Sequence, residues 1–382
     1  MPGDPASFSL LHRTCKLVVL LCLLHISVSV VFYVRSMDIR SAFVQNQQAH
    51  SNVTERNQLT STGVSSRPGV SSRPGPTETP KDEPGQGPPP RGEPEPEVLE
   101  PVVLELHPGK ELEKCPETSP LLVGPLRVEF TTSISLEQIT RSNRNLRPGG
   151  RFKPTGCQAL QKVAIIIPFR NRDEHLKYWL YYLHPILQRQ QLDYGVYVIN
   201  QDGVEIFNRA KLLNVGYKEA LKEYDYDCFV FSDVDLIPMD DRNTYACFSQ
   251  PRHLSVSMDK FGFRLPYNQY FGGVSSMSKE QFLKINGFPN NYWGWGGEDD
   301  DIYNRLASKG MSISRPNSEV GKCRMIRHER DKQNDPNPQR FNRIAHTRET
   351  MHKDGINSLS YKVVKLEKLD LFTKITVDVG KP

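Results

Sequence analysis

The sequence predicts an α/β fold, in which helices cover both faces of a mainly parallel sheet and form a three-layer domain. The first observation is the unbroken apolar run at residues 163–169, which is typical of a parallel strand buried on both faces. The second is the order strand, helix, strand, helix, strand between residues 163 and 231. In sheets of this kind ligands bind beyond the carboxyl ends of the strands, so we expect the functional residues there.

The predicted elements follow one another along the chain. After the first strand, residues 173–190 place leucines at 176, 180, 183 and 187 on one face of a helix. A second strand is expected at 196–200, a second helix at 207–221 and a third strand at 228–231. Ser278 and Gln281 have the spacing of a capping box for a further helix. No G-x-G-x-x-G motif follows the first strand, so the dinucleotide-binding fingerprint is absent.

The N-terminal region has a different character. Residues 17–34 carry no formal charge and are close to the length that spans the hydrocarbon core of a membrane. The alternative is a cleaved signal peptide, but the apolar run is long for one and lacks an Ala-x-Ala-like exit. We therefore predict a short cytoplasmic tail at 1–16 and a transmembrane signal anchor at 17–34. Because everything that could fold follows the anchor, the folded part is expected in the lumen.

Residues 35–112 are predicted to form a stem. Eleven of the 29 prolines lie between Pro68 and Pro101, and the sequence Ser-Ser-Arg-Pro-Gly occurs there twice. A segment of this composition cannot bury a core. Asn52 begins an Asn-Val-Thr glycosylation acceptor sequence, which would be accessible in a stem. Residues 113–382 remain as one folded domain with a sizeable core.

Composition excludes several classes of protein. The 49 Lys and Arg residues are interspersed with 44 Asp and Glu residues, and the net charge of +5 over 382 residues is not the basic footprint of a nucleic-acid-binding protein. Collagen, coiled-coil and multi-span membrane proteins are excluded as well. Five of the seven cysteines follow the anchor, which agrees with a lumenal location.

Two acids, Asp233 and Asp235, follow the third predicted strand. Their i, i+2 spacing projects both side chains to the same side of an extended chain. Carboxylate oxygens at a strand end suit Mg²⁺ or Mn²⁺ bridging a diphosphate. The bare Asp-x-Asp pattern also occurs at 225–227 and 299–301, but only the copy at 233–235 follows an apolar strand.

Residues 292–301 combine aromatic rings, glycines and acids in the order Tyr-Trp-Gly-Trp-Gly-Gly-Glu-Asp-Asp-Asp. Four consecutive acids are ordinarily a solvated helix start, and this is the alternative to a functional role. Trp293 and Trp295, however, offer flat faces on which sugars stack, and the carboxylates can accept hydrogen bonds from sugar hydroxyls. We interpret the segment as a saccharide site in which one acid, its pKa raised by its neighbours, serves as a base.

The segment Met325-Ile-Arg-His328 is a third candidate. A lone histidine is more often a surface or capped residue than a metal ligand. A thioether is soft and matches Mg²⁺ or Mn²⁺ poorly, so from the residues alone Met325 is a worse candidate than His328.

Together, four motifs resemble those of the vertebrate β-1,4-galactosyltransferases, and the resemblance extends over about residues 115–382. In chain order they are Pro168-Phe-Arg-Asn-Arg172, Phe231-Ser-Asp-Val-Asp235, Trp293-Gly-Trp-Gly-Gly-Glu-Asp-Asp-Asp301 and Met325-Ile-Arg-His328. That family is a group of type II Golgi membrane proteins with the GT-A fold. The resemblance therefore implies this fold on a Golgi membrane, and it leaves open a secreted or cell-surface form.

The resemblance also implies roles for single residues. The donor contacts would be Pro168, Phe169, Arg170, Arg172, Phe207, Asp233, Trp295 and Tyr270. The acceptor contacts would be Tyr267, Asp300, Arg340, Phe341 and Ile344. Asp299 would be the base with Glu298 beside it, and Asp235, Met325 and His328 would bind Mn²⁺ in spite of the soft thioether. The disulfides would join Cys115 to Cys157 and Cys228 to Cys247, which leaves Cys323 free.

The predicted function is therefore Mn²⁺-dependent transfer of galactose from UDP-galactose to the 4-hydroxyl of terminal N-acetylglucosamine, with inversion. One alternative is transfer of N-acetylgalactosamine from its UDP donor, which the bulk of Tyr270 opposes. Another is a non-catalytic lectin for N-acetylglucosamine, which would need neither the acids nor the metal set. The sequence leaves open whether α-lactalbumin, a partner known in this family, binds the chain, and whether the chain forms a homodimer.

Overall fold

The computed structural model describes residues 112–329 and 331–382. The predicted tail and anchor and nearly all of the predicted stem, with Asn52, lie outside the described residues. Within the described ranges, none of the helices combines the length and the apolarity that a membrane crossing requires.

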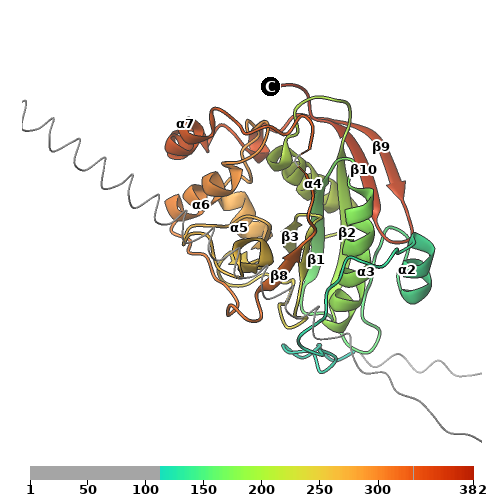
Figure 1. The fold of residues 1–382 in the computed structure, drawn as a ribbon. Coiled ribbons are helices and arrows are strands. Elements are labelled where there is room, and N and C mark those ends of the chain that lie inside the picture. The colour runs from blue at the N-terminus through green and yellow to red at the C-terminus, as the bar shows by residue number, and fades with distance from the viewer. Residues whose placement is uncertain (1–111, 330) are drawn as a thin grey trace, which may run out of the picture. The chain divides into compact units, whose positions relative to one another are not determined.

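A seven-stranded sheet forms the centre of the described part (Figure 1), with the strand order β5-β7-β3-β1-β2-β10-β9. The four strands β3, β1, β2 and β10 are parallel, while β7, β5 and β9 join through antiparallel pairs. The strands are β1 (Lys162–Phe169), β2 (Asp193–Gln201), β3 (Cys228–Ser232), β5 (Arg252–His253), β7 (Val274–Ser278), β9 (Lys362–Lys368) and β10 (Thr373–Asp378). The predicted parallel centre is confirmed, and the strands beyond it make the sheet mixed.

Helices pack on both faces of this sheet, which confirms the three-layer prediction. Side chains alternate along β1, so Ile165 and Ile167 pack with α3 in one core, whereas Ala164 and Ile166 pack with α4 in the other. Figure 1 shows α5, α6 and α7 grouped to one side of the sheet. The α-helices are α2 (Leu136–Ser142), α3 (Asp173–Arg189), α4 (Arg209–Glu223), α5 (Lys279–Lys284), α6 (Glu298–Ser308), α7 (Arg340–Ala345) and α8 (Thr347–Thr350). Two 3₁₀ turns, Asp259–Phe261 and Ile356–Ser358, complete the set.

The predicted elements are present, and their ends differ for local reasons. Helix α4 begins at Arg209 and not at residue 207 because the side chain of Asn208 accepts a hydrogen bond from the backbone N–H of Lys211 and caps the helix. Strand β2 begins at Asp193 because its pairing with β1 starts between Asp193 and Lys162. The capping box of Ser278 and Gln281 is formed at the start of α5.

Among the described residues two disulfides are formed, and they are the pairs that the resemblance implies. Cys115 is joined to Cys157, and Cys228 of β3 is joined to Cys247. Cys323 is free and buried.

A smaller sheet stands apart from the central one, with the strand order β4-β8-β6. Its strands are β4 (Leu236–Pro238), β6 (Ser257–Met258) and β8 (Lys322–Met325). Because β4 follows β3 after only three residues, this sheet brings β8 to the carboxyl end of the central sheet.

Candidate active site

A cavity of about 470 Å³ lies where β1, β2 and β3 end, as expected for a sheet with a parallel centre. Pro168 comes from the end of β1, Phe207 from the segment after β2 and Asp233 from the residue after β3. The other predicted site residues in its lining are Arg170, Arg172, Asp235, Tyr267, Tyr270, Trp295, Glu298, Asp299, Asp300, Met325, His328, Arg340, Phe341 and Ile344.

Phe169 is the exception among the predicted contacts. Successive side chains of a strand point to opposite faces, so Phe169 points away from the face of Pro168. Its side chain is 2% exposed and belongs to the core that includes Ile165 and Ile167. The structure thus places the side chain of Phe169 in the core, and the donor contact that the resemblance implies for this residue stays a prediction.

The two sheets bring Asp235 and His328 together. Leu236 of β4 pairs with Met325 of β8, and the backbone N–H of Ile326 donates to the carbonyl oxygen of Asp235 over 2.8 Å. This pairing places Nε2 of His328 3.0 Å from Oδ2 of Asp235, although the two residues are 93 positions apart. Met325, in the same pair of strands, also lines the cavity.

These side chains are a partial fit to a divalent cation. A carboxylate oxygen and an imidazole nitrogen that face each other are ligand types that Mn²⁺ accepts, whereas the thioether of Met325 is soft. Within the described residues there is no group of three or more His, Cys, Asp and Glu side chains that could hold a metal. A metal at this place would therefore depend on Asp235, His328 and one weaker donor.

Basic residues adjoin the pair formed by Asp235 and His328. Nη2 of Arg172 lies 2.7 Å from Nδ1 of His328, and the guanidinium also pairs with Asp331. The ring of His175 lies 5.3 Å from that of His328. The hydrogen bond to Asp235 raises the pKa of His328, and burial opposes this effect only in part.

The acidic segment begins helix α6, whose first residues also line the cavity. Gly297 caps the helix with φ 98°, a left-handed conformation that glycine adopts without strain. Glu298, Asp299 and Asp300 line the cavity, whereas Asp301 is 1% exposed and is not part of the lining. The interpretation as a solvated helix start is therefore wrong for Glu298 and Asp301, which are both buried.

Arg209 connects the two acid clusters, and our sequence analysis missed it. Its Nε donates to Oδ1 of Asp233 over 2.7 Å, and its Nη1 lies 3.1 Å from Oδ1 of Asp299 and 3.6 Å from Oε1 of Glu298. A signal was present, because Arg209 is the first residue of α4 and the first turn of that helix contains no acid. The helix dipole disfavours a cation at this position, so an arginine there calls for a partner from elsewhere in the fold.

Burial and mutual repulsion shift the pKa values of these acids upward. Burial and the neighbouring Asp299 raise the pKa of Glu298 to about 8, against the attraction of Arg209. Burial also raises the pKa of Asp299, which Arg209 partly offsets, and that of Asp233 to about 6. Burial lowers the pKa of Arg209 less than Asp233, Asp299 and Glu298 raise it, so the guanidinium stays charged.

Asp299 lies against the backbone, beside Tyr270. A side chain at Gly272 would approach Oδ2 of Asp299 to 2.2 Å and Cε2 of Tyr270 to 2.8 Å, so only glycine allows this arrangement. The hydroxyl of Tyr267 donates to Oδ1 of Asp300 over 2.8 Å. Two tyrosines thus stand beside the carboxylates that face the cavity.

The mouth of the cavity is aromatic. The side chain of Trp295 is 53% exposed, while its backbone is held by two hydrogen bonds of 2.9 Å to Asp335 and Asn337. Helix α7 contributes Arg340, Phe341 and Ile344, and Phe341 is 71% exposed. Exposed aromatic rings in the same lining as carboxylates suit a sugar, which has apolar faces and hydroxyl edges.

Comparisons with known proteins agree with this arrangement. One family model, described as the N-terminal region of glycosyl transferase group 7, matches residues 115–248, and a second, described as the N-terminal domain of galactosyltransferase, matches residues 252–329. The chain is 57% identical to β-1,4-galactosyltransferase 1 of Mus musculus over 393 residues and 57% identical to that of Homo sapiens over 401 residues. Each alignment covers 100% of this chain and 96% of the relative.

A solved structure with a similar fold is the Drosophila β-1,4-galactosyltransferase 7, in a variant complexed with manganese, UDP-Gal and xylobiose. It is 29% identical in sequence, with a TM-score of 0.51, and the match covers 58% of this chain and 96% of that one. The fold of the described domain is therefore that of a GT-A-like glycosyltransferase.

Proposed function

Because this chain belongs to the β-1,4-galactosyltransferase family, we propose that it transfers galactose from UDP-galactose to the 4-hydroxyl of a terminal N-acetylglucosamine, with inversion at the anomeric carbon. Residues 119–125 read Ser-Pro-Leu-Leu-Val-Gly-Pro and resemble β-1,4-galactosyltransferase 1 in particular. The relatives that are 57% identical over the whole chain carry that name.

One observation carries the proposal. A single cavity is lined both by Asp235 and His328 and by the acids of α6 with three residues of α7. The first group, which we call the donor end, suits a diphosphate and its cation, and the second, the acceptor end, suits a sugar acceptor. An enzyme that joins a nucleotide-sugar donor to a sugar acceptor needs both groups in one cavity.

The donor end offers charge of the right sign. Arg170 and Arg172 line the cavity and would attract the diphosphate of UDP-galactose. Asp235, His328 and Met325 would hold Mn²⁺, which, when bound, supplies positive charge to offset the negative charge that develops on the departing diphosphate. Tyr270 would stand beside the galactose and limit the space at its C2 position.

The acceptor end offers a base. Asp299 would take the proton of the 4-hydroxyl while that oxygen forms a bond to the anomeric carbon and the bond from this carbon to UDP breaks with its electron pair. A raised pKa makes the carboxylate a stronger base than an exposed aspartate, and Arg209 keeps its Oδ1 in a fixed position 3.1 Å away. A single displacement of this kind inverts the anomeric carbon and needs no nucleophilic Ser, Cys or Lys.

We place the enzyme on the Golgi membrane as a single-pass type II protein, with the anchor at 17–34 and the catalytic domain in the lumen. The composition of the N-terminal region and the resemblance to the family support this location. A secreted or cell-surface form, α-lactalbumin as a partner, glycosylation at Asn52 and a homodimer remain predictions.

The test is a donor panel with the purified chain. UDP-galactose, UDP-glucose and UDP-N-acetylgalactosamine are offered with N-acetylglucosamine, first with Mn²⁺ and then with excess EDTA. We expect a β1,4-linked galactoside from UDP-galactose only with the metal. A preference for UDP-N-acetylgalactosamine would favour the alternative transferase, and binding of N-acetylglucosamine without product from any donor would favour the lectin.

A further inference from the structure

Asp301 differs from the three acids that precede it. Residues of a helix are displaced by about 100° each, so the fourth acid cannot share the direction of all the others. Glu298, Asp299 and Asp300 line the cavity, whereas Asp301 is buried behind them with 1% of its surface exposed. A carboxylate in this position needs partners, and it has them on three elements.

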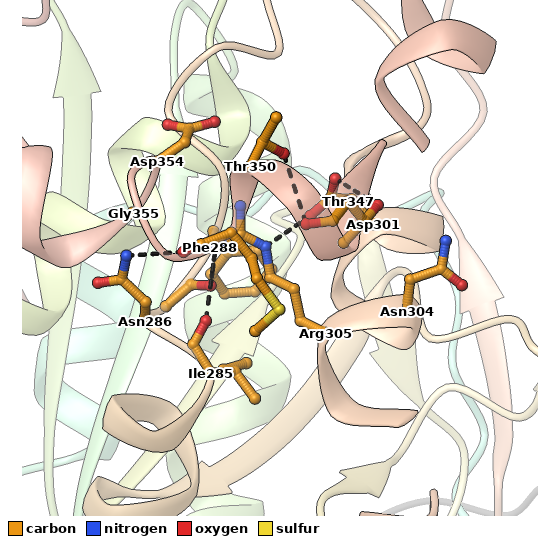
Figure 2. A network of polar contacts seen from close by, with 12 residues as sticks. Ile285, Asn286, Phe288, Asp301, Asn304, Arg305, Thr347, Thr350, Asp354 and Gly355 are labelled. Atoms are coloured by element: carbon orange, nitrogen blue, oxygen red, sulfur yellow. Dashed lines mark hydrogen bonds and ion pairs between the residues drawn. The ribbon is translucent and has the colours of Figure 1, made fainter. Parts of the chain in front are cut away.

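The two carboxylate oxygens of Asp301 have different partners, and Figure 2 shows Arg305 and Thr347 among them. Oδ1 accepts from Nε of Arg305, one turn further along α6, over 2.6 Å. Oδ2 accepts from the hydroxyl of Tyr292 over 3.0 Å and from Oγ1 of Thr347 over 2.9 Å. Tyr292 belongs to the segment before α6, and Thr347 is the first residue of α8.

The ion pair with Arg305 fixes the position of the Asp301 carboxylate. The side chain is 0% exposed, and its Nη1 donates to the carbonyl oxygens of Ile285 and Gly287. A buried charge without an ion-pair partner strongly destabilises the folded protein, so Asp301 is held beside Arg305. Any group bound to the other oxygen of Asp301 is thereby held in a fixed relation to α6.

Thr347 links the fixed carboxylate of Asp301 to the neighbouring helix α7. Its hydroxyl lies 2.9 Å from Oδ2 of Asp301 and 2.9 Å from the carbonyl oxygen of Ile344 in α7, so its single proton is shared between an acceptor on α6 and an acceptor on α7. Nδ2 of Asn304, also in α6, donates to the same carbonyl over 3.2 Å. The last residues of α7 are therefore tied to α6 by two side chains.

We propose that Thr347 is a positioning residue that sets the register between the base on α6 and the acceptor wall on α7. This inference rests on the proposed function, in which Asp299 is the base and Arg340, Phe341 and Ile344 face the N-acetyl group. The 4-hydroxyl and the N-acetyl group are on the same sugar ring, so both contacts are made at once only when the two helices keep one spacing. Thr347 itself does not line the cavity.

The test compares two threonines of the same helix. Thr347→Val removes the hydroxyl that reaches Asp301 and keeps the shape. Thr350→Val is the matched control, because Thr350 is exposed and its hydroxyl contacts only the backbone oxygens of His346 and Thr347 (Figure 2). The measurement is kcat/KM for N-acetylglucosamine and for glucose, which lacks the N-acetyl group, together with the KM for UDP-galactose.

We expect Thr347→Val to lower the preference for N-acetylglucosamine over glucose about tenfold, the size of one lost hydrogen bond to a charged group. The KM for UDP-galactose should stay unchanged. The separate variant Thr347→Ser keeps the hydroxyl and should therefore keep the preference for N-acetylglucosamine. Thr350→Val should behave as the unmodified chain.

Two results would overturn the inference. One is an unchanged preference in Thr347→Val, and the other is an equal loss for both acceptors and the donor, which is what simple destabilisation produces. If Thr347→Val does not fold, Asn304→Ala removes the second tie to Ile344 and must lower the preference in the same way. Failure of the unmodified chain to prefer N-acetylglucosamine would instead reject the proposed function, and the inference with it.

Discussion

The two acid clusters of the cavity contain the same kind of side chain in different surroundings. Asp235 is at the end of a strand, and its carboxylate faces the imidazole of His328. Glu298 and Asp299 start a helix, and their carboxylates face the partly buried guanidinium of Arg209. An imidazole can share a metal with a carboxylate, whereas a guanidinium has no lone pair and can only donate hydrogen bonds.

The difference teaches that the partner and not the acid determines the chemistry at each end. The strand-end cluster is suited to bind a cation, and the helix cluster already contains one in Arg209. Arg209 also pairs with Asp233, so one positive charge joins the helix cluster to the acid that lies two residues before Asp235. Substitutions in both clusters and at Tyr270 test this difference.

The largest effect is expected for Asp235→Asn. The substitution removes the charged member of the metal set, and we expect loss of nearly all turnover with a folded protein, because the residue lies at the end of a strand. Mn²⁺ affinity, measured by electron paramagnetic resonance, should fall by more than the roughly 10–100-fold that an outer partner contributes. Asp233→Asn, which changes a partner of Arg209, should be milder. Near-normal Mn²⁺ binding in Asp235→Asn would contradict the assignment.

Asp299→Asn should have the next largest effect. Asparagine keeps the size but cannot accept the proton of the acceptor hydroxyl, so kcat should fall by about 10²–10⁴-fold. The affinity for UDP-galactose, measured by calorimetry, should change little, because Asp299 faces the acceptor in the proposed reaction.

Glu298→Gln is the control for Asp299→Asn, since it changes another acid of the same cluster to its amide. Equal and small losses of kcat in both variants would show that the acids of α6 have only a structural role. The distinction between a metal-binding cluster and a cluster that contains the catalytic base would then be wrong.

Tyr270→Leu tests the donor end by changing space and not charge. The shorter side chain should admit the N-acetyl group of UDP-N-acetylgalactosamine while galactose transfer continues. We expect the ratio of the two donor rates to shift by about tenfold toward the larger donor, as for a pocket that gains the volume of a few methylene groups. An unchanged ratio would mean that Tyr270 does not face the donor sugar.

The smallest effect concerns the stability of the helix cluster. Burial raises the pKa of Glu298 from 4.5 to about 8, so the folded state holds a proton that the unfolded chain releases between these pH values. The free energy of unfolding therefore falls as the pH rises through this window. It reaches its lowest value, as far as Glu298 is concerned, only above about pH 8. Glu298→Gln should remove this dependence and be more stable than the unmodified chain at pH 8.

Thermal unfolding at pH 5 and pH 8 measures this effect. Each kcal/mol should raise the melting temperature by about 2–4 °C in a domain of this size. Glu319→Gln is the control, because Glu319 is exposed and paired with Lys322. A difference between Glu298→Gln and the unmodified chain that is the same at both pH values would contradict a raised pKa.

Local patterns predicted the part of the fold from β1 to β3 and the start of α5. The leucines of 173–190 do bury one face of α3, and the apolar run at 163–169 is the central strand β1. The same patterns placed Asp233 and Asp235 at a strand end and the acids at the start of α6. These features depend on periodicity within a few residues, so a single sequence is sufficient to predict them.

Other features exist only in the folded chain. Phe169 is next to a site residue in sequence, but the alternation of the strand turns its side chain into the core. Asp301 continues a run of acids, but the turn of the helix directs it to Arg305 and Thr347. The pairing of Arg209 with Asp299 joins residues 90 positions apart. The sequence by itself determined which residues are helical, extended, apolar or charged. Only the tertiary structure decided which charges meet. A buried charge loses its contact with water and needs a partner from the protein, and packing, not the order of residues along the chain, determines which group that is.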